Sequence, residues 1–325
     1  MITSPPVLIR NDMTLQHKTP STYQLEKLIE LAPYVGNTSL YPIKNLTENP
    51  EVKLFAKLEW QQFGGSVKAR AAYRIVRDVV ESGKWQKGKR LLDATSGNTG
   101  IAYAIFAAVA GIPLTIVLPE NASIERKNIL NTLGVEVIFS SPFESTEGAQ
   151  DLAKELVQKN PGLYVYLDQY SNPLNTLAHY QSTAPEIWRQ TQGEITHFIA
   201  GLGTTGTFTG TGSRLKEFNK DIELIALQPD SALHGLEGWK HLETARTPKI
   251  YNPTLADQFR AVSTEKAYEL IPSVAKKEGL HLSPSAAANL LGAIELSHEL
   301  EKGIIVTTFA DNADKYPEII KLLLQ

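Results

Sequence analysis

Four short stretches place phosphate-binding or reactive residues at the ends of apolar runs. The first is HFIAGLGTTGT, residues 197–207, whose three glycines have the spacing G-x-G-x-x-G. The backbone N–H groups of such a loop, at the start of a helix, bind phosphate. Its threonines add hydroxyl donors, which suits a phosphate monoester with three free oxygens better than a pyrophosphate. The loop therefore favours a phosphorylated cofactor, while Asp230, at the end of the next apolar run, keeps a dinucleotide as the alternative.

The second stretch is SVKARAAYRIVRDVVES, residues 66–82, which predicts a helix with Ser66 as N-cap and Arg70 on its outer face. Lys68 heads a different row, which faces the core. That row continues with Ala72, Val76 and Val80. A lysine removed from water has a lowered pKa and becomes a good nucleophile for a Schiff base. The alternative is a first-turn lysine whose side chain extends to solvent.

The third and fourth stretches place polar side chains at the starts of apolar helices. In LDATSGNTGIAYAIF the predicted helix follows four polar residues, although an N-cap needs only one side chain. They are Thr95, Ser96, Asn98 and Thr99. Four donors at the positive end of a buried helix suit a carboxylate, and an ordinary cap is the alternative. In HLSPSAAANLLGA, Ser285 begins an Ala- and Leu-rich helix, where capping alone explains a serine.

The elements that must position these residues alternate along the chain. Short β-prone runs such as VKLFAKLE, RLLDA, PLTIVLP and IIVTTF are separated by helix-patterned stretches, including those near 147–159, 175–191 and 264–278. This alternation predicts an α/β fold with parallel sheets and helical crossovers, in two halves that meet near residues 145–165. Residues 1–33 contain one amphipathic patch, TYQLEKLIEL, and are predicted to form an N-terminal extension.

Composition excludes several classes of function. The 325 residues are 42% apolar and carry a net charge of −3, with no basic cluster, which argues against a nucleic-acid partner. The absence of cysteine excludes disulfides and thiolate chemistry, and the seven histidines lack zinc-ligand spacing, so no metal site is expected. No apolar run reaches the roughly 18 residues of a membrane span. We therefore expect a cytoplasmic protein that acts on small molecules, with no membrane partner.

Together, these stretches resemble the β-family (fold type II) of pyridoxal 5′-phosphate (PLP) enzymes, and within it the cysteine synthases, or O-acetylserine sulfhydrylases, most nearly the B type. The similarity runs from about Tyr34 to Tyr316, with GSVK, ATSGNTGIA, LPENASIERK, LDQYSNP, AHYQSTAPEIW, GLGTTGT and ALQP in the family's order. It implies two domains, each with a mostly parallel, twisted sheet flanked by helices. The larger would comprise residues 34–50 and 160–325. The smaller would comprise 51–159, with a mobile subdomain at about 90–145.

Carried over position by position, the resemblance implies a role for each residue type in the site. Lys68 would hold PLP as an internal aldimine and act as general base, and Ser285 would meet the pyridine nitrogen. The other implied PLP contacts are Asn98, which would bind the 3′-oxygen, and the 5′-phosphate residues Gly203, Thr204, Thr205, Gly206 and Thr207. The implied substrate-carboxylate contacts are Thr95, Ser96, Thr99 and Gln169.

The reaction that the resemblance implies is a β-replacement on an O-activated L-serine. O-acetylserine or O-phosphoserine would lose its leaving group to give an α-aminoacrylate, to which sulfide or thiosulfate adds, forming cysteine or S-sulfocysteine. Alternatives are cystathionine β-synthase-like or cysteine desulfhydrase chemistry, and a non-catalytic homologue that only binds ligands. The family also implies a homodimer, whereas nothing in these residues indicates an association with serine acetyltransferase.

Three departures from the family pattern leave the substrate pair open. Ala69 replaces the aspartate that usually follows the lysine, so its pairing with a neighbouring arginine is absent. SPSAAA, with Pro284, stands where the family has G-I-S-S-G-A, and DNADKY, residues 311–316, replaces a run containing arginine before a tyrosine. The loop SALHGLEGWKH offers possible anion contacts, with a solvated loop as the alternative. These are His234, Lys240 and His241.

Overall fold

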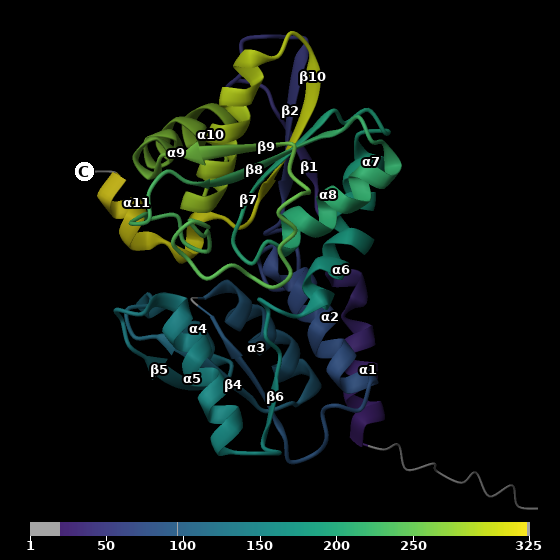
Figure 1. Ribbon diagram of the computed structural model, residues 1–325, viewed down its shortest axis with the longest axis vertical. Helices are drawn as coiled ribbons and strands as arrows, with labels where there is room; N and C mark the ends of the chain where they lie inside the picture. Colours follow the sequence, from purple (N-terminus) through teal and green to yellow (C-terminus); the bar gives the residue numbers. More distant parts are fainter. Residues whose placement is uncertain (1–19, 96, 324–325) are drawn as a thin grey trace, which may run out of the picture.

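Two twisted sheets form the framework of the computed structural model, which describes residues 20–95 and 97–323 (Figure 1). Among the strands in these residues, all neighbours are parallel except the first pair, β1 and β2. The six-stranded sheet has the order β1 (Leu40–Ile43), β2 (Val52–Leu58), β10 (Gly303–Phe309), β7 (His197–Gly201), β8 (Glu223–Pro229), β9 (Gln258–Val262). The four-stranded sheet has the order β5 (Glu136–Ser140), β4 (Leu114–Pro119), β3 (Arg90–Ala94), β6 (Tyr164–Tyr166). The predicted α/β architecture with two mostly parallel sheets is confirmed.

Helices cover both faces of each sheet. On the six-stranded sheet, α9 (Thr264–Glu278) and α10 (Pro284–Glu299) bury one face, and α7 (Thr183–Gln190) and α8 (Gly206–Phe218) bury the other. On the four-stranded sheet, α2 (Lys68–Glu81) and α3 (Asn98–Ala110) pack on one face and α5 (Ser145–Lys159) on the other. The remaining helices are α1 (Pro20–Glu30), η1 (Ala32–Tyr34), α4 (Ile124–Thr132), α6 (Pro173–Gln181), η2 (Ala313–Lys315) and α11 (Pro317–Leu323).

Local sequence signals set the boundaries of several helices. The hydroxyl of Ser263 caps α9, and Gly279 ends it with φ 70°, a conformation that glycine adopts without steric cost. Asn172 caps α6 through the N–H of Leu174. The helix predicted near 264–278 therefore has the bounds that its cap and glycine indicate, whereas the one predicted near 175–191 is divided into α6 and α7 at Ser182.

Each sheet has a topological switch point, where the strand order reverses. In the six-stranded sheet the chain runs outward from β7 through β8 to β9, and returns to the other side of β7 with β10. In the four-stranded sheet it runs outward from β3 through β4 to β5 and returns beside β3 with β6. Parallel sheets bind ligands outside the carboxyl ends of their strands, where the order reverses. The segments after β7 and β3 are the two glycine- and threonine-rich loops, so the topology alone indicates a ligand site there.

A buried ionic cluster joins the two sheets. It consists of four residues that are at most 5% exposed: Lys57 on β2, Glu59 just after β2, Arg70 on α2 and Glu186 on α7. The Arg70 guanidinium pairs with Glu59 and Glu186, each at 2.7 Å, and Lys57 Nζ lies 2.7 Å from Glu186. The prediction that Arg70 lies on the outer face of its helix is therefore wrong, because the two carboxylates compensate its charge in the interior. They also provide arginine pairing of the kind that the missing aspartate at Ala69 was expected to supply.

Several segments pack or pair across the domain boundaries that the sequence predicted, and the domain assignment itself stays a prediction. From residue 20 on, the expected N-terminal extension is the helix α1, which packs on α2 and α3 and buries Leu28 completely. The predicted boundaries at 51 and 159 do not follow the sheets, because β2 joins the six-stranded sheet and β6 the four-stranded one. Both strands pair with partners distant in the chain, which local patterns do not reveal. The edge strands β1 and β9 were also missed.

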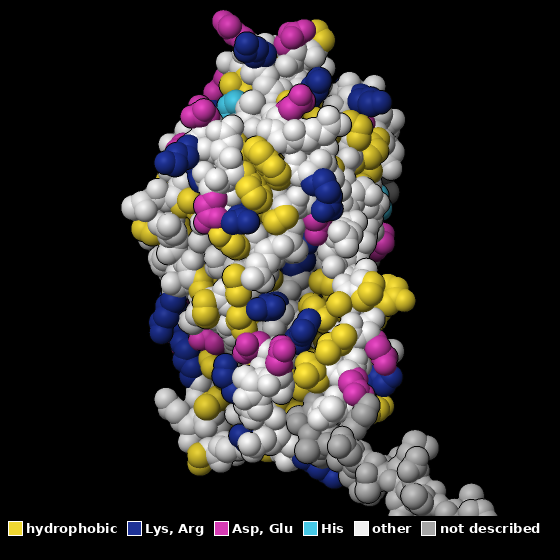
Figure 2. Space-filling model, turned by 90° about the vertical axis from the view of Figure 1, so that its right-hand side faces the viewer, with side chains coloured by type: hydrophobic (Ala, Val, Ile, Leu, Met, Phe, Trp, Pro, Cys, Tyr) yellow, Lys and Arg dark blue, Asp and Glu magenta, His cyan; other side chains and the backbone are white. Residues whose placement is uncertain are grey.

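The surface carries mixed charge. Figure 2 shows basic and acidic side chains interspersed with apolar ones on one face of the molecule, without a single-sign stripe. Within residues 20–95 and 97–323, no helix has the length and apolar character needed to cross a bilayer.

Candidate active site

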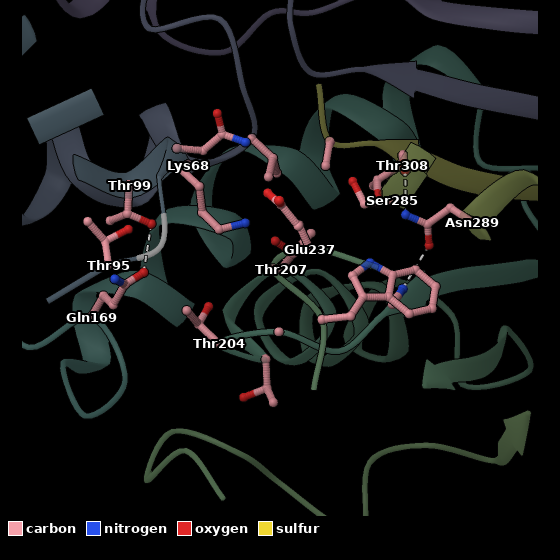
Figure 3. A pocket seen from close by; sticks show the side chains of 18 of the residues that line it. Lys68, Thr95, Thr99, Gln169, Thr204, Thr207, Glu237, Ser285, Asn289 and Thr308 are labelled. Atoms are coloured by element: carbon pink, nitrogen blue, oxygen red, sulfur yellow. Dashed lines mark hydrogen bonds between the residues drawn. The ribbon is translucent and has the colours of Figure 1, made fainter. Parts of the chain in front are cut away.

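Lys68 is the first residue of α2, and its amine points into a pocket between the two sheets (Figure 3). Burial lowers the pKa of this amine, the nearby Lys315 lowers it further, and the Asp311 carboxylate opposes both. The apolar row behind it is buried, as predicted. Ser66 does not cap the helix: no side chain does, and its buried hydroxyl has no hydrogen-bond partner among the described residues. Instead, the N–H of Val67 donates to Ala310 O at 2.8 Å, which anchors the start of α2 to the end of β10.

The glycine- and threonine-rich loop after β7 opens toward the same pocket. Thr205 has a left-handed backbone, with φ 70°, just before α8 begins. A Cβ on Gly203 would lie 2.0 Å from Gly238 O, and one on Gly206 would lie 2.0 Å from Asn175 Oδ1, so only glycine fits at either position. The buried hydroxyl of Thr205 has no partner among the described residues. A helix N-terminus with unsatisfied donors is a binding site for an anion such as phosphate.

The predicted carboxylate residues meet on the opposite side of the pocket. Thr99 Oγ1 donates to Gln169 Oε1 at 2.7 Å, and Gln169 Nε2 donates to Ala94 O at 2.8 Å (Figure 3). Thr95 Oγ1 accepts from the N–H of Gly97 at 3.0 Å. All three residues line the pocket: Thr95 follows β3, Thr99 lies in the first turn of α3, and Gln169 follows β6. Ser96, predicted to act with them, lies outside the described residues.

Ser285 lines the pocket on the side of α10. It is not the helix cap: Ser283 is the N-cap, and its hydroxyl accepts from the N–H of Ala286 and lies 3.3 Å from that of Ser285. With Ser283 capping, the Ser285 hydroxyl is left to face the pocket. The segment before it is irregular, with a single bridge between Leu282 and Asn312.

One pocket is thus lined by a lysine, a loop suited to binding phosphate, a polar cluster suited to binding a carboxylate, and a serine. Its lining includes Lys68, Thr95, Asn98, Thr99, Gln169, Gly203, Thr204, Thr205, Thr207 and Ser285. This donor set fits PLP. The unpartnered Thr205 hydroxyl and the glycine-only turn suit its phosphate, and a buried amine of lowered pKa suits its aldehyde.

Comparison with known proteins gives the family. The model of the pyridoxal-phosphate dependent enzyme family matches residues 31–311. This chain belongs to that family. It is a PLP-dependent enzyme, as the sequence predicts. A cysteine synthase of Aquifex aeolicus is 46% identical over 93% of each chain, and a cysteine synthase B of Pseudomonas aeruginosa is 38% identical over 88% of this chain and 95% of its own. The crystal structure of an O-acetylserine dependent cystathionine β-synthase of Helicobacter pylori is 32% identical, with a TM-score of 0.82, over 88% of this chain and 96% of its own.

Sequence reasoning missed a charged pair at the mouth of the enzyme's pocket. Arg126 on α4 is 3% exposed and pairs with Glu237, which belongs to the loop after β8. The Arg126 guanidinium also lies over the ring of Tyr316, 5.1 Å from its centroid. The motif LPENASIERK contains this arginine, but nothing local indicates that its partners come from residues 237 and 316.

Another missed residue, Asn289, ties α10 to two strands. Its Oδ1 accepts from the N–H of Gly201 at 2.8 Å, and its Nδ2 donates to Thr308 O at 2.8 Å (Figure 3). It thereby fixes the carboxyl ends of β7 and β10 beside the pocket. The sequence offered only a polar residue one turn after Ser285.

Of the three residues predicted as possible anion contacts, Lys240 already has partners within the protein. It is 7% exposed, pairs with Glu147 of α5 at 3.1 Å and lies over the ring of Tyr170. The alternative of a solvated loop is also wrong for this residue. His234 and His241 line a second pocket beyond Arg126, and burial lowers the pKa of His234.

Proposed function

We propose that this enzyme catalyses β-replacement on O-acetyl-L-serine with sulfide, giving L-cysteine and acetate. The observation that carries the proposal is the position of Lys68: a buried amine at the head of α2 that faces a phosphate-type loop, a carboxylate-type cluster and a serine in one pocket. The cysteine synthases to which the chain is similar support the choice of reaction.

We assign each role to a group already directed at the pocket. When bound, PLP withdraws electrons from the substrate's α-carbon. Lys68 Nζ would hold the cofactor's aldehyde and is placed to take the proton from the substrate's α-carbon as general base, a role that its lowered pKa supports. Gln169 Nε2 has one N–H bound to Ala94 O and a second available to the substrate carboxylate. Ser285 offers a neutral hydroxyl to the ring nitrogen, which favours elimination over transamination.

Paired charges at the mouth favour an acetyl over a phosphoryl leaving group. Arg126 is paired with Glu237, and Lys240 with Glu147. Each cation is therefore already neutralised by a carboxylate, and that carboxylate would repel a phosphate dianion. A neutral acetyl ester is not repelled. Both pairs line the second pocket.

The test supplies each substrate separately. O-acetylserine, O-phosphoserine and serine are each offered with sulfide or with thiosulfate, and the products are identified by mass. We expect cysteine from O-acetylserine and sulfide at the highest kcat/KM. Lys68→Ala should abolish turnover and the absorption band of the bound cofactor, and Lys276→Ala, at an exposed lysine, should do neither. Cofactor binding without turnover of any O-activated serine would refute the proposal and favour a binding homologue.

A second candidate is the use of homocysteine in place of sulfide. The similarity to an O-acetylserine dependent cystathionine β-synthase favours it. The second pocket, which shares Arg126, Glu237 and Trp239 with the first, offers room for a nucleophile larger than sulfide. Competition between sulfide and homocysteine for the same O-acetylserine, read as the ratio of cysteine to cystathionine, decides between the two.

We also propose a cytoplasmic homodimer that acts on small molecules. The exposed aromatic side chains Tyr34 and Phe63, whose ring centroids are 6.5 Å apart, support a surface that a second copy covers. The cytoplasm follows from the proposed substrates, which are intermediates of amino-acid metabolism. The mass of the holoenzyme by light scattering tests the assembly.

A further inference from the structure

The segment Ala310–Tyr316, which contains the DNADKY departure, contacts the chain at three places around the active site. Ala310 O accepts from the N–H of Val67, next to Lys68. Asp311 O accepts from the Ser283 hydroxyl, which in turn lies 3.3 Å from that of Ser285. Two side chains of the segment also bind Asn98. The segment is therefore placed to control the residues on which cofactor binding depends.

The amide of Asn98 is held from both sides. Lys315 Nζ donates to Asn98 Oδ1 at 2.9 Å, and Asn98 Nδ2 donates to Asp311 Oδ2 at 2.8 Å. Lys315 Nζ also donates to Gly65 O at 3.0 Å. An ammonium group can only donate and an ionised carboxylate can only accept, so both neighbours impose the same orientation on the amide. Its oxygen must face Lys315, and its nitrogen must face Asp311.

This orientation leaves one donor free for a ligand. The Nδ2 group has two hydrogens, of which Asp311 takes one. Asp311 itself is fixed, because it is fully buried and its Oδ2 also accepts from the Tyr316 hydroxyl at 2.9 Å. The second hydrogen of Asn98 is available on the pocket side, since Asn98 lines the pocket. A flipped amide would present an acceptor there and would repel an anionic oxygen.

We propose that Lys315 is a positioning residue, which together with Asp311 locks the Asn98 amide with its N–H toward the 3′-oxygen of PLP. The inference rests on the proposed placement of the cofactor against Asn98. Lys315 acts through Asn98 and touches neither substrate nor reacting atoms. Burial lowers the pKa of the Lys315 amine and Asp311 opposes that shift, so the carboxylate helps to keep Lys315 a charged donor.

The experiment measures PLP binding to the apoenzyme and the absorption maximum of the bound cofactor in Lys315→Met, Lys315→Arg and Asn98→Ala. We expect Lys315→Met to raise the Kd for PLP about tenfold, as for a lost hydrogen bond to an anionic oxygen, and to shift the absorption maximum. Lys315→Arg keeps a cationic donor and should restore most of the affinity. Lys302→Met, at an exposed lysine, is the matched control and should bind PLP as the unmodified enzyme does.

The double variant Asn98→Ala/Lys315→Met identifies the route. If Lys315 acts through Asn98, the second substitution adds less than twofold to the Kd of the first. Multiplicative effects, or an unchanged absorption maximum in Lys315→Met, would overturn the inference. If Lys315→Met does not fold, Lys315→Gln, which also removes the charge, takes its place. Because these measurements use cofactor binding alone, a lack of cysteine formation would refute the proposed function without deciding the role of Lys315.

Discussion

Asp93, the residue before the end of β3, is a buried carboxyl group that organises the substrate side of the site. Its Oδ1 accepts from the N–H of Ala94 at 2.8 Å, and its Oδ2 accepts from the N–H of Gln169 at 3.3 Å. Burial raises the pKa of Asp93 to about 8, and the charge of Asp168 adds to the increase. The stability from such a group is fully present below its unfolded pKa, about 4, and is lost as the pH rises toward about 8.

Asp93→Asn removes this titration at nearly constant size. Between pH 5 and pH 8, the free energy of unfolding of the unmodified enzyme should fall relative to that of the variant, by up to about 1.4 kcal/mol per pH unit. Its thermal midpoint should fall accordingly. Thermal unfolding of both holoenzymes across this range measures the effect. Asp221→Asn, at an exposed residue, is the control. A difference that does not change with pH would mean that Asp93 stays in one protonation state throughout.

At the residue scale, the sequence predicted what local chemistry determines. Lys68 stood out because a charged residue headed an apolar row, and the loop after β7 because glycine spacing and hydroxyls occur together. Arg126 and Glu237 carried no such signal, since each is an ordinary charged residue until the fold brings them together. The roles assigned to individual site residues stay predictions, which the variants at Lys68 and Lys315 test.

At the element scale, the buried ionic cluster makes a sharp prediction for the packing of β2, α2 and α7. In the unmodified enzyme, the Arg70 guanidinium holds the pKa of Glu186 at about 2, which keeps this carboxylate charged. Arg70→Met would leave Glu59 and Glu186 buried with only Lys57 to compensate their charge. We expect a loss of about 3–5 kcal/mol in the free energy of unfolding. Urea denaturation of the holoenzyme measures it.

The matched control for this cluster is Arg77→Met, two turns further along the same helix. Arg77 pairs with Glu81 at 3.5 Å on the surface, where such a pair contributes at most about 0.5 kcal/mol. Equal losses for both arginine variants would show that the interior pairs add nothing beyond a surface pair. The sequence placed Arg70 on the outer face, because helical periodicity does not reveal two acids from other elements.

Element types were predictable where sheet membership was not. Buried parallel strands appear as short apolar runs bounded by turns, so β3, β4, β7, β8 and β10 were all expected from the sequence. Membership depends on pairing between strands that are distant in the chain. β2 pairs with β10, near the other end of the chain, and β6 returns beside β3. No local pattern contains that information.

At the scale of the whole molecule, ion pairs bridge the two sheets across the mouth of the pocket. The helices α4 and α5, which pack against strands of the four-stranded sheet, carry Arg126 and Glu147. Their partners Glu237 and Lys240 belong to the loop after β8 of the six-stranded sheet. Both pairs would stabilise an arrangement in which the sheets enclose a bound amino acid. We therefore expect closure to depend on them more than on any contact with the substrate's leaving group.

A double-mutant cycle on Glu147→Gln and Lys240→Met tests this coupling. Each single variant should raise the KM for O-acetylserine several-fold with little change in kcat, because a less stable closed form weakens binding without altering the groups that react. The double variant should be less impaired than the product of the singles, by about fivefold, since neither partner is then left unpaired. Arg246→Gln removes a neighbouring pair with Asp151 that is exposed on both sides, and should change KM less than twofold. Multiplicative single effects would show that Glu147 and Lys240 influence binding independently, and closure would then have to depend on the Arg126–Glu237 pair alone.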